Sequence, residues 1–219
     1  MGAAVLHKQF ESILGGPLSW QSRPEPEGVP SGIPALEFPR GCLTEIVGPA
    51  SSGRTTLLFS LLAQAAARQE ICAFIDAADS FSPHSAAAAG VDLARLLWVR
   101  CGHNAEHALK AADLLIQGGG FGLVVMDLGD TPAASARRIS LTSWFRLRRA
   151  VEHTPTVLVT LARESNARTC ASLVVECTRR ADTWSGAPGV SRLLRSSQVN
   201  AQSTQRRKSC SPVFTAPAI

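Results

Sequence analysis

Residues 43–56 read LTEIVGPASSGRTT, and this stretch decides the fold because it joins a strand, a glycine-rich turn and the start of a helix. Leucines at helical spacing follow the turn from Leu57 to Leu62. Two glycines are spaced as in the phosphate-binding pattern G-x-x-x-x-G-K-[ST], with arginine in the place of lysine. The loop and the first residues of its helix are Gly48, Pro49, Ala50, Ser51, Ser52, Gly53, Arg54, Thr55 and Thr56.

Such a loop turns successive backbone N–H groups toward one point at the positive end of a helix dipole, which favours an anionic phosphate. Thr55 would bring its hydroxyl to a phosphate-bound Mg²⁺. The alternative is a connection between a strand and a helix, rich in serine and glycine, that binds no ligand. Arg54 keeps the positive charge of the pattern, but its planar guanidinium cannot copy the compact contact of a lysine.

Apolar strands alternate with helices on both sides of this stretch. We expect strands at 43–47, 71–76, 96–99, 123–127, 156–161 and 172–178, and helices at 55–68, 85–89, 105–117 and 134–152. Continuous apolar strands separated by helices are typical of a parallel sheet that helices cover on both faces. The sequence therefore predicts an α/β core with a mostly parallel sheet over residues 41–182.

Two flanking regions differ in composition from this core. Residues 1–40 combine a short amphipathic helix at 4–14, which must dock on a partner, with a proline-rich arm. Residues 183–219 are rich in polar residues, and we expect them to be mostly disordered, with one strand near 193–199. Seven basic residues but one acidic residue follow Thr178, so that the tail either binds a polyanion or serves solubility.

Composition favours a cytoplasmic protein. No apolar run approaches the about 20 residues of a membrane span, and the first residues lack the apolar segment of a secretion signal. The six cysteines have no paired spacing, and Cys42, Cys72 and Cys177 lie in apolar strands, as reduced core thiols do.

Carboxylates close two of the predicted strands. Asp127 follows the most apolar run of the chain, and Asp76 closes a second strand, with Asp79 nearby. Because ligands bind at the carboxyl ends of strands in open parallel sheets, Asp127 is our candidate for holding Mg²⁺ through water. The alternative for Asp127 is an ordinary turn residue before Gly129.

Arginines mark a candidate surface for nucleic acid. On the predicted helix 134–152 they share one half of the wheel, and Leu141 and Phe145 fall on the same side. A solvated arginine-rich face is the alternative. The candidate DNA-binding residues are Arg137, Arg138, Arg146, Arg149, Arg163 and Arg168. Cys101, His103 and His107 lack a fourth ligand at finger spacing, so we expect no intrinsic metal site.

The residues quoted so far resemble the RecA recombinase family. Gly48 to Thr56 are similar to that family's G-P-E-S-S-G-K-T-T, and the run from Phe74 to Pro83 resembles its F-I-D-A-E-H-A-L-D-P. Three short pieces of the approach to the loop also match: Ser31-Gly32, Pro39-Arg40-Gly41 and Glu45-Ile46. The resemblance implies a RecA-like P-loop NTPase core that binds ATP and Mg²⁺. It also implies subunits that assemble as a homo-oligomer or filament on single-stranded DNA, in DNA repair, recombination and the SOS response.

The sequence departs from the family at positions that matter for hydrolysis. Ala78 stands where the family has the glutamate that activates water, and Asp79, one residue on, is the remaining candidate catalytic base. The adenine-stacking tyrosine falls at Ser85, and the glutamine that senses the γ-phosphate falls near Leu161 or Ala162. These losses argue against efficient hydrolysis, because each group positions the transition state. The pattern is similar to that of diverged ImuA-type accessory proteins of mutagenesis cassettes.

Two classes of function follow from the sequence, and the enzyme assignment stays open between them. One is an ATP-binding protein that binds single-stranded DNA with weak or no ATP hydrolysis. The other is a non-catalytic adaptor of the same fold that binds a recombinase filament or a translesion polymerase. A kinase-like phosphate-loop enzyme is a third reading, for which the chain shows no acceptor-substrate motif.

Overall fold

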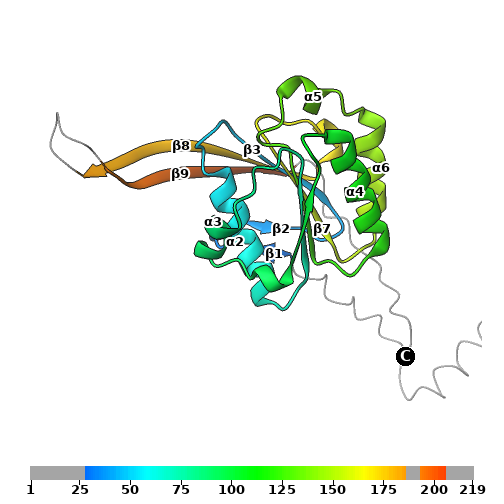
Figure 1. The fold of residues 1–219 in the computed structure, drawn as a ribbon, viewed down its shortest axis with the longest axis horizontal. Coiled ribbons are helices and arrows are strands. Elements are labelled where there is room, and N and C mark those ends of the chain that lie inside the picture. Colours follow the sequence, from blue (N-terminus) through cyan, green and yellow to red (C-terminus); the bar gives the residue numbers. More distant parts are fainter. Residues whose placement is uncertain (1–27, 186–192, 206–219) are drawn as a thin grey trace, which may run out of the picture.

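A seven-stranded sheet forms the centre of the molecule. The computed structural model describes residues 28–185 and 193–205, and Figure 1 shows their arrangement. The strands lie in the order β5-β4-β6-β7-β3-β8-β9, and they are parallel except for the antiparallel pair β8 and β9. Their bounds are β3 Leu43–Val47, β4 Cys72–Asp76, β5 Leu96–Arg100, β6 Leu123–Asp127, β7 Val157–Ala162, β8 Leu173–Ser185 and β9 Leu193–Gln205. The predicted, mostly parallel sheet is confirmed, and β3 lies between β7 and β8.

Helices cover both faces of the sheet (Figure 1). Helix α2 (Arg54–Ala67) and the short α3 (Pro83–Ala88) lie on one face, and α4 (Ala105–Gly118), α5 (Ala133–Arg137) and α6 (Leu141–Val151) lie on the other. Successive strand residues point to opposite faces, so each strand contributes to two apolar layers. Leu58 and Leu62 of α2 pack in one buried cluster with Ile46, whereas Trp144 and Leu147 of α6 pack in the other with Leu158.

Part of the predicted arm belongs to the core. Residues 28–40 contain a small antiparallel hairpin of β1 (Val29–Pro30) and β2 (Glu37–Phe38). Val29 and Phe38 are fully buried against α2, and Ser60 Oγ of that helix donates to the Ser31 carbonyl at 2.7 Å. Two apolar residues of the predicted arm therefore pack in the hydrophobic core, although prolines surround them. The predicted helix at 4–14 lies outside the described residues.

The single helix predicted at 134–152 is wrong. The structure has two helices there, because Ser140 Oγ accepts a hydrogen bond from Ser143 N at 3.1 Å and starts α6. Trp144, Leu147 and Val151 are buried, whereas Leu141 and Phe145 are exposed on the arginine-bearing side, as the sequence indicated. The break separates Arg137 and Arg138 from the arginines of α6, so these arginines do not share one face of a single helix.

Two long strands form an arm at one edge of the sheet. β8 and β9 pair from Leu173↔Gln205 to Ser185↔Leu193, and their far ends project from the body (Figure 1). Residues 193–205 were expected to be mostly disordered, with a strand near 193–199, but the strand continues to Gln205. Its polar residues form a strand because their backbone groups pair with β8, which no local signal reveals. Residues 186–192 and 206–219 of the predicted tail lie outside the described residues.

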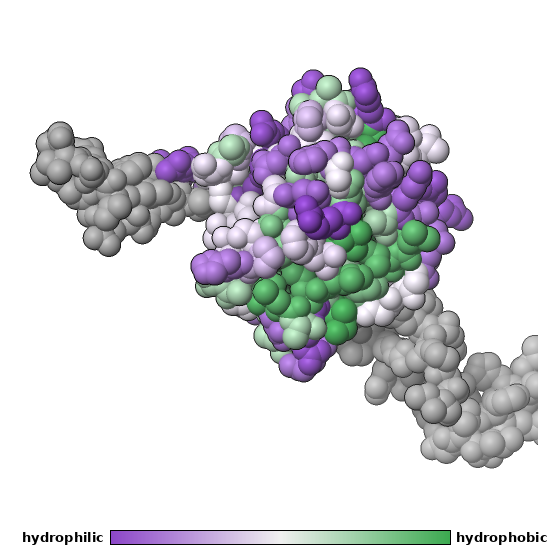
Figure 2. All heavy atoms as spheres, viewed as in Figure 1, coloured by the Kyte–Doolittle hydropathy of each residue, from purple (hydrophilic) through white to green (hydrophobic). Residues whose placement is uncertain are grey.

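The opposite edge of the sheet carries exposed apolar side chains. On and around β5, the exposed fractions of Leu93, Leu97 and Trp98 are 39%, 44% and 36%. Ile71 and Leu114 are exposed nearby, and Figure 2 shows hydrophobic side chains gathered over this part of the face. Within the described ranges, the longest helices are too short and too polar to cross a bilayer.

The difference in burial between two leucines predicts different effects of their substitution on stability. Leu58 of α2 is fully buried and Leu114 of α4 is 70% exposed. Leu58→Ala should lower the free energy of unfolding by about 2–5 kcal/mol, because it leaves a cavity under α2. The matched change Leu114→Ala should alter it by less than about 0.5 kcal/mol. Urea unfolding followed by circular dichroism measures both, and equal effects would contradict the packing described here.

Candidate nucleotide site

The phosphate loop connects β3 to α2 at the carboxyl end of the sheet. Gly48 can have no side chain, because a Cβ there would lie 2.5 Å from the Cys177 carbonyl oxygen and 2.5 Å from Ser52 Oγ. Gly53 has a φ of 87°, in the region that favours glycine, immediately before the helix. Pro49, Ala50, Ser51, Thr55 and Thr56 are exposed. The loop is therefore accessible, and the N–H groups of the first turn of α2 lack helical acceptors.

Arg54 is buried inside this loop. Its guanidinium donates to the Gly48 carbonyl at 2.6 Å and to the Gly129 carbonyl at 3.0 Å, and it lies 3.5 Å from Asp130 Oδ1. The residue is 6% exposed, and a Cβ at Gly129 would lie 2.9 Å from its Nη2. Arg54 thus joins the phosphate loop to the loop that follows β6. The sequence predicted a positive charge at the loop, but it did not indicate the hydrogen bond from Arg54 to the Gly129 carbonyl.

A second arginine binds the same carbonyl. Arg163, which directly follows β7, donates from Nε to the Gly129 oxygen at 3.1 Å, and its Nη2 lies 3.9 Å from Asp130 Oδ1. Its side chain is 56% exposed, in contrast to that of Arg54. The backbone after β6 is therefore held between one buried and one exposed arginine.

Asp127 closes β6 beneath this contact. Its Oδ1 accepts a hydrogen bond from Gly129 N at 2.7 Å, and the residue is 8% exposed. Burial is the main cause that raises the pKa of Asp127 from 3.8 to about 6, and the charges of Asp76 and Asp130 also raise it. The Gly129 N–H and Arg54 act in the opposite direction. At neutral pH the carboxylate is ionised, which a Mg²⁺ ligand requires.

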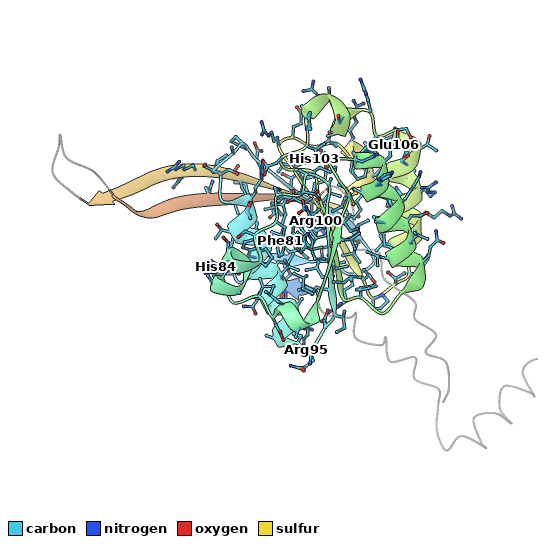
Figure 3. The ribbon with its side chains drawn as sticks, viewed as in Figure 1. Phe81, His84, Arg95, Arg100, His103 and Glu106 are labelled. Atoms are coloured by element: carbon cyan, nitrogen blue, oxygen red, sulfur yellow. The ribbon has the colours of Figure 1, made fainter. Side chains whose placement is uncertain are left out.

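The carboxylates at the end of β4 are held by partners outside the phosphate loop. Asp76 is fully buried, and it accepts hydrogen bonds from Ser80 N at 3.0 Å and Phe81 N at 2.9 Å. Asp79, with a φ of 53°, forms an ion pair with Arg100 of β5 at 3.3 Å. Figure 3 shows Arg100 and Phe81 on this part of the molecule. Three strands (β4, β6 and β7) lie between β5 and β3, so Asp79 points toward the outer edge of the sheet rather than toward the loop.

Glu45 is a residue whose role the sequence analysis missed. It is fully buried in β3, and its carboxylate accepts hydrogen bonds from Ser165 Oγ at 2.5 Å and from the backbone N–H groups of Asn166 and Ala167, each at 2.8 Å. One carboxylate thus holds the loop after β7 against the strand that carries the phosphate loop. A charged residue in the middle of an apolar strand was the available signal, because a buried charge needs partners.

The candidate DNA-binding arginines separate into several places. Arg137 and Arg168 line a cavity of about 370 Å³ between the α5–α6 junction and the loop after β7, with Trp144 in its wall. Arg137 also pairs with Glu164 at 2.7 Å. Arg138 and Arg146 line a neighbouring groove, and Arg149 is exposed on α6. Arg163 instead lies against the Gly129 carbonyl.

Comparisons with known proteins agree with this geometry. A family model described as the RecA N-terminal domain matches residues 28–137, about half of the chain. The chain is 40% identical over 134 residues to protein RecA of Corynebacterium urealyticum, covering 58% of this chain and 36% of that protein. It is 42% identical over 106 residues to protein RecA of Cutibacterium acnes, covering 45% and 30%. The chain thus spans about a third of the length of these curated relatives.

A solved structure shares the fold. The crystal structure of the RadB recombinase superposes with a TM-score of 0.54 at 17% sequence identity, and the match covers 94% of this chain and 90% of that one. At this identity the likeness concerns the arrangement of strands and helices alone.

The raised pKa of Asp127 predicts a pH dependence of stability. The native carboxyl binds its proton more tightly than the unfolded chain does, so the free energy of unfolding should fall as the pH rises from about 4 to about 6. Asp127→Asn should abolish this fall and should stabilise the protein at neutral pH by on the order of 2–3 kcal/mol. Urea unfolding in EDTA across this pH range measures the effect.

Asp92→Asn is the matched control for this measurement. Asp92 caps a short 3-10 turn (Leu93–Arg95) with a half-exposed side chain, and asparagine caps equally well. Its pH profile should match that of the wild type. An Asp127→Asn protein that keeps the wild-type slope would contradict the assignment.

Proposed function

The chain belongs to the RecA family, and from this premise we propose that it is an ATP-binding protein that binds single-stranded DNA and hydrolyses ATP weakly or not at all. Its setting would be DNA repair and recombination, including the SOS response. The observation that carries the proposal is the Arg54 guanidinium, which puts a buried positive charge inside an otherwise accessible phosphate loop. A triphosphate is the anion that this loop, with a helix N-terminus behind it, suits.

The residues of the site fit a nucleotide with its metal ion. Loop and helix N–H groups would bind the phosphates, and Thr55 and the ionised Asp127 would hold Mg²⁺, directly or through water. Bound Mg²⁺ would neutralise phosphate charge. Ser52 Oγ, which is buried without a hydrogen-bond partner among the described residues, is a further donor next to Gly48. Arg54 would exchange a carbonyl partner for a phosphate oxygen, which is a stronger acceptor because it is charged.

The same site lacks the groups that hydrolysis needs. Ala78 carries no group that could orient water, and the carboxylate of Asp79 is paired with Arg100. Leu161 and Ala162, at the position of the family's sensing glutamine, are buried apolar residues. Since positioning and charge supply most of the catalysis in phosphoryl transfer, we expect bound ATP to persist.

Single-stranded DNA would bind at the cavity lined by Arg137 and Arg168. Both side chains come from segments on either side of the cavity, and Ser140 and Asn166 add polar groups. Leu141 and Phe145 are 45% and 41% exposed on the adjacent surface of α6. Exposed aromatic and basic side chains together are what unpaired bases and their phosphates require.

One observation favours the alternative function as a non-catalytic adaptor. The Arg54 guanidinium already donates hydrogen bonds to two carbonyl oxygens. If these bonds do not yield to a nucleotide, the fold would serve as a scaffold for a recombinase or a translesion polymerase. The exposed apolar residues around β5 would suit a protein partner or a second copy of this chain. Nucleotide binding separates the two functions.

The nucleotide proposal predicts how changes at Arg54 affect ATP binding. Wild-type protein should bind a fluorescent ATP analogue in the presence of Mg²⁺, and Arg54→Lys should preserve binding because the charge remains. Arg54→Gln keeps a hydrogen-bond donor but loses the charge, so its affinity should fall at least about tenfold. Circular dichroism confirms that each variant is folded. Absent wild-type binding would favour the adaptor, and an unchanged affinity in Arg54→Gln would exclude Arg54 as a phosphate ligand.

The DNA proposal predicts a change in salt dependence. Arg137→Ala should weaken binding of an oligothymidylate and reduce the slope of log affinity against log salt by about 0.7, the loss of one phosphate contact on a single strand. Fluorescence anisotropy at several salt concentrations measures this slope. Arg95→Ala is the control, because Arg95 lies before β5 and bonds to Gln69 instead. Equal slopes for wild type and Arg137→Ala would refute the contact.

A further inference from the structure

A second groove lies beside the cavity of Arg137 and Arg168. It encloses about 580 Å³ between the first half of α4 and the α5–α6 junction. This size is typical of pockets that hold small organic groups. Its polar wall includes His103, Lys110, Arg138, Ser140, Ser143 and Arg146. Figure 3 labels His103 and Glu106 at the end of the groove where α4 begins.

The groove is predominantly basic. Three basic side chains, Lys110, Arg138 and Arg146, come from separate elements, and Glu106 is the acidic residue in the wall. Arg146 is partly neutralised by Asp113, which lies 3.6 Å away. Lys110 and Arg138 are exposed. The electrostatic balance therefore favours an anion.

Side chains, rather than helix ends, supply the donors. The side chain of Asn104 already accepts hydrogen bonds from the N–H groups of Glu106 and His107, at 2.9 and 3.2 Å, so the start of α4 is closed by its own cap. The hydroxyls of Ser140 and Ser143 lie 2.9 Å apart, and one proton suffices for that bond. The other hydroxyl proton is available to an acceptor in the groove.

The groove adjoins the first cavity at the α5–α6 junction. Ile139 and Ser140 line both, and Arg138 follows directly after Arg137. A ligand long enough to pass over this junction would therefore reach the second groove. An extended polyanion uses such a series of basic sites, whereas a small ligand would occupy one of them.

We propose that single-stranded DNA continues from the Arg137–Arg168 cavity into this groove, where Lys110 and Arg138 bind its phosphates and the serine hydroxyls add hydrogen bonds. The inference rests on the proposed DNA binding and extends it to α4. Short oligonucleotides fill the first cavity alone, and longer ones reach Lys110. The length dependence of binding is therefore a property of the groove.

Lysine acetylation provides a direct test of this path. The sequence contains three lysines, Lys8, Lys110 and Lys208, so peptide mass spectrometry separates them readily. With Mg²⁺ and ATP present, an oligothymidylate of about 20 nucleotides should slow acetylation of Lys110 several-fold, and one of about 6 nucleotides should slow it much less. Unchanged acetylation of Lys110 under conditions where anisotropy shows the long strand bound would overturn the proposal.

A charge reversal tests the same contact energetically. Lys110→Glu should weaken binding of the long oligonucleotide about tenfold, lower the salt slope by about 0.7 or more, and leave the short one nearly unaffected. Arg95→Glu is the matched reversal, because Arg95 lies at the bottom of the molecule in Figure 3, well below His103, and the two residues lie before and after β5. It should leave both affinities unchanged.

The outcomes distinguish this inference from the function on which it rests. If the wild type binds neither oligonucleotide, the proposed DNA binding is wrong, and this inference falls with it. If the wild type binds both and Lys110→Glu binds the long strand normally, DNA binding stands and the path through the groove is wrong. If Arg95→Glu weakens binding as much as Lys110→Glu does, the effect is one of net charge and the groove is not the cause.

Discussion

The hydrogen bonds of the Arg54 guanidinium connect the parts of the molecule on which its chemistry depends. One bond goes to the Gly48 carbonyl of the phosphate loop and another to the Gly129 carbonyl after β6. Lysine would offer a point charge here, whereas the planar fork of arginine can hold two carbonyls at once. This bridge fixes the spacing between the loop and the end of the strand that carries Asp127. In the proposed function, a nucleotide would bind one arm of this fork while the other arm kept its carbonyl partner.

Hydrogen bonds connect the candidate nucleotide site to the loop that lines the Arg137–Arg168 cavity. The Gly129 carbonyl accepts hydrogen bonds from both Arg54 and Arg163, and Arg163 begins the loop that lines the Arg137–Arg168 cavity. Glu45, two residues before the end of β3, holds the same loop through Ser165, Asn166 and Ala167. A shift of the phosphate loop would therefore be transmitted to the loop after β7 in two ways, through the Gly129 carbonyl and through Glu45. If the chain binds ATP and DNA as proposed, such a connection would let ATP influence DNA binding without being hydrolysed, because binding free energy alone can shift an equilibrium between two arrangements.

Local patterns predicted the elements between residues 43 and 162 to within a residue or two, except for the divided helix. Apolar runs at strand length predicted the strands, and apolar residues at helical spacing predicted the helices. The features that the sequence missed depend on distant partners. Arg54 meets a carbonyl 75 residues away, and Glu45 meets amides more than 120 residues away. The polar strand β9 forms because β8 offers it backbone partners, and Asp79 forms an ion pair with Arg100, 21 residues further along the chain. None of these relations follows from composition or periodicity.

The central claim is that this site keeps the means to hold ATP and lacks the means to cleave it. Release of inorganic phosphate from ATP, with Mg²⁺ and saturating single-stranded DNA, tests this claim most directly. We predict a rate close to the background of a protein-free reaction, with or without DNA, because Ala78 has no group to activate water and Asp79 is paired with Arg100. Turnover that DNA stimulates strongly would show that another residue performs this task, and it would contradict the account.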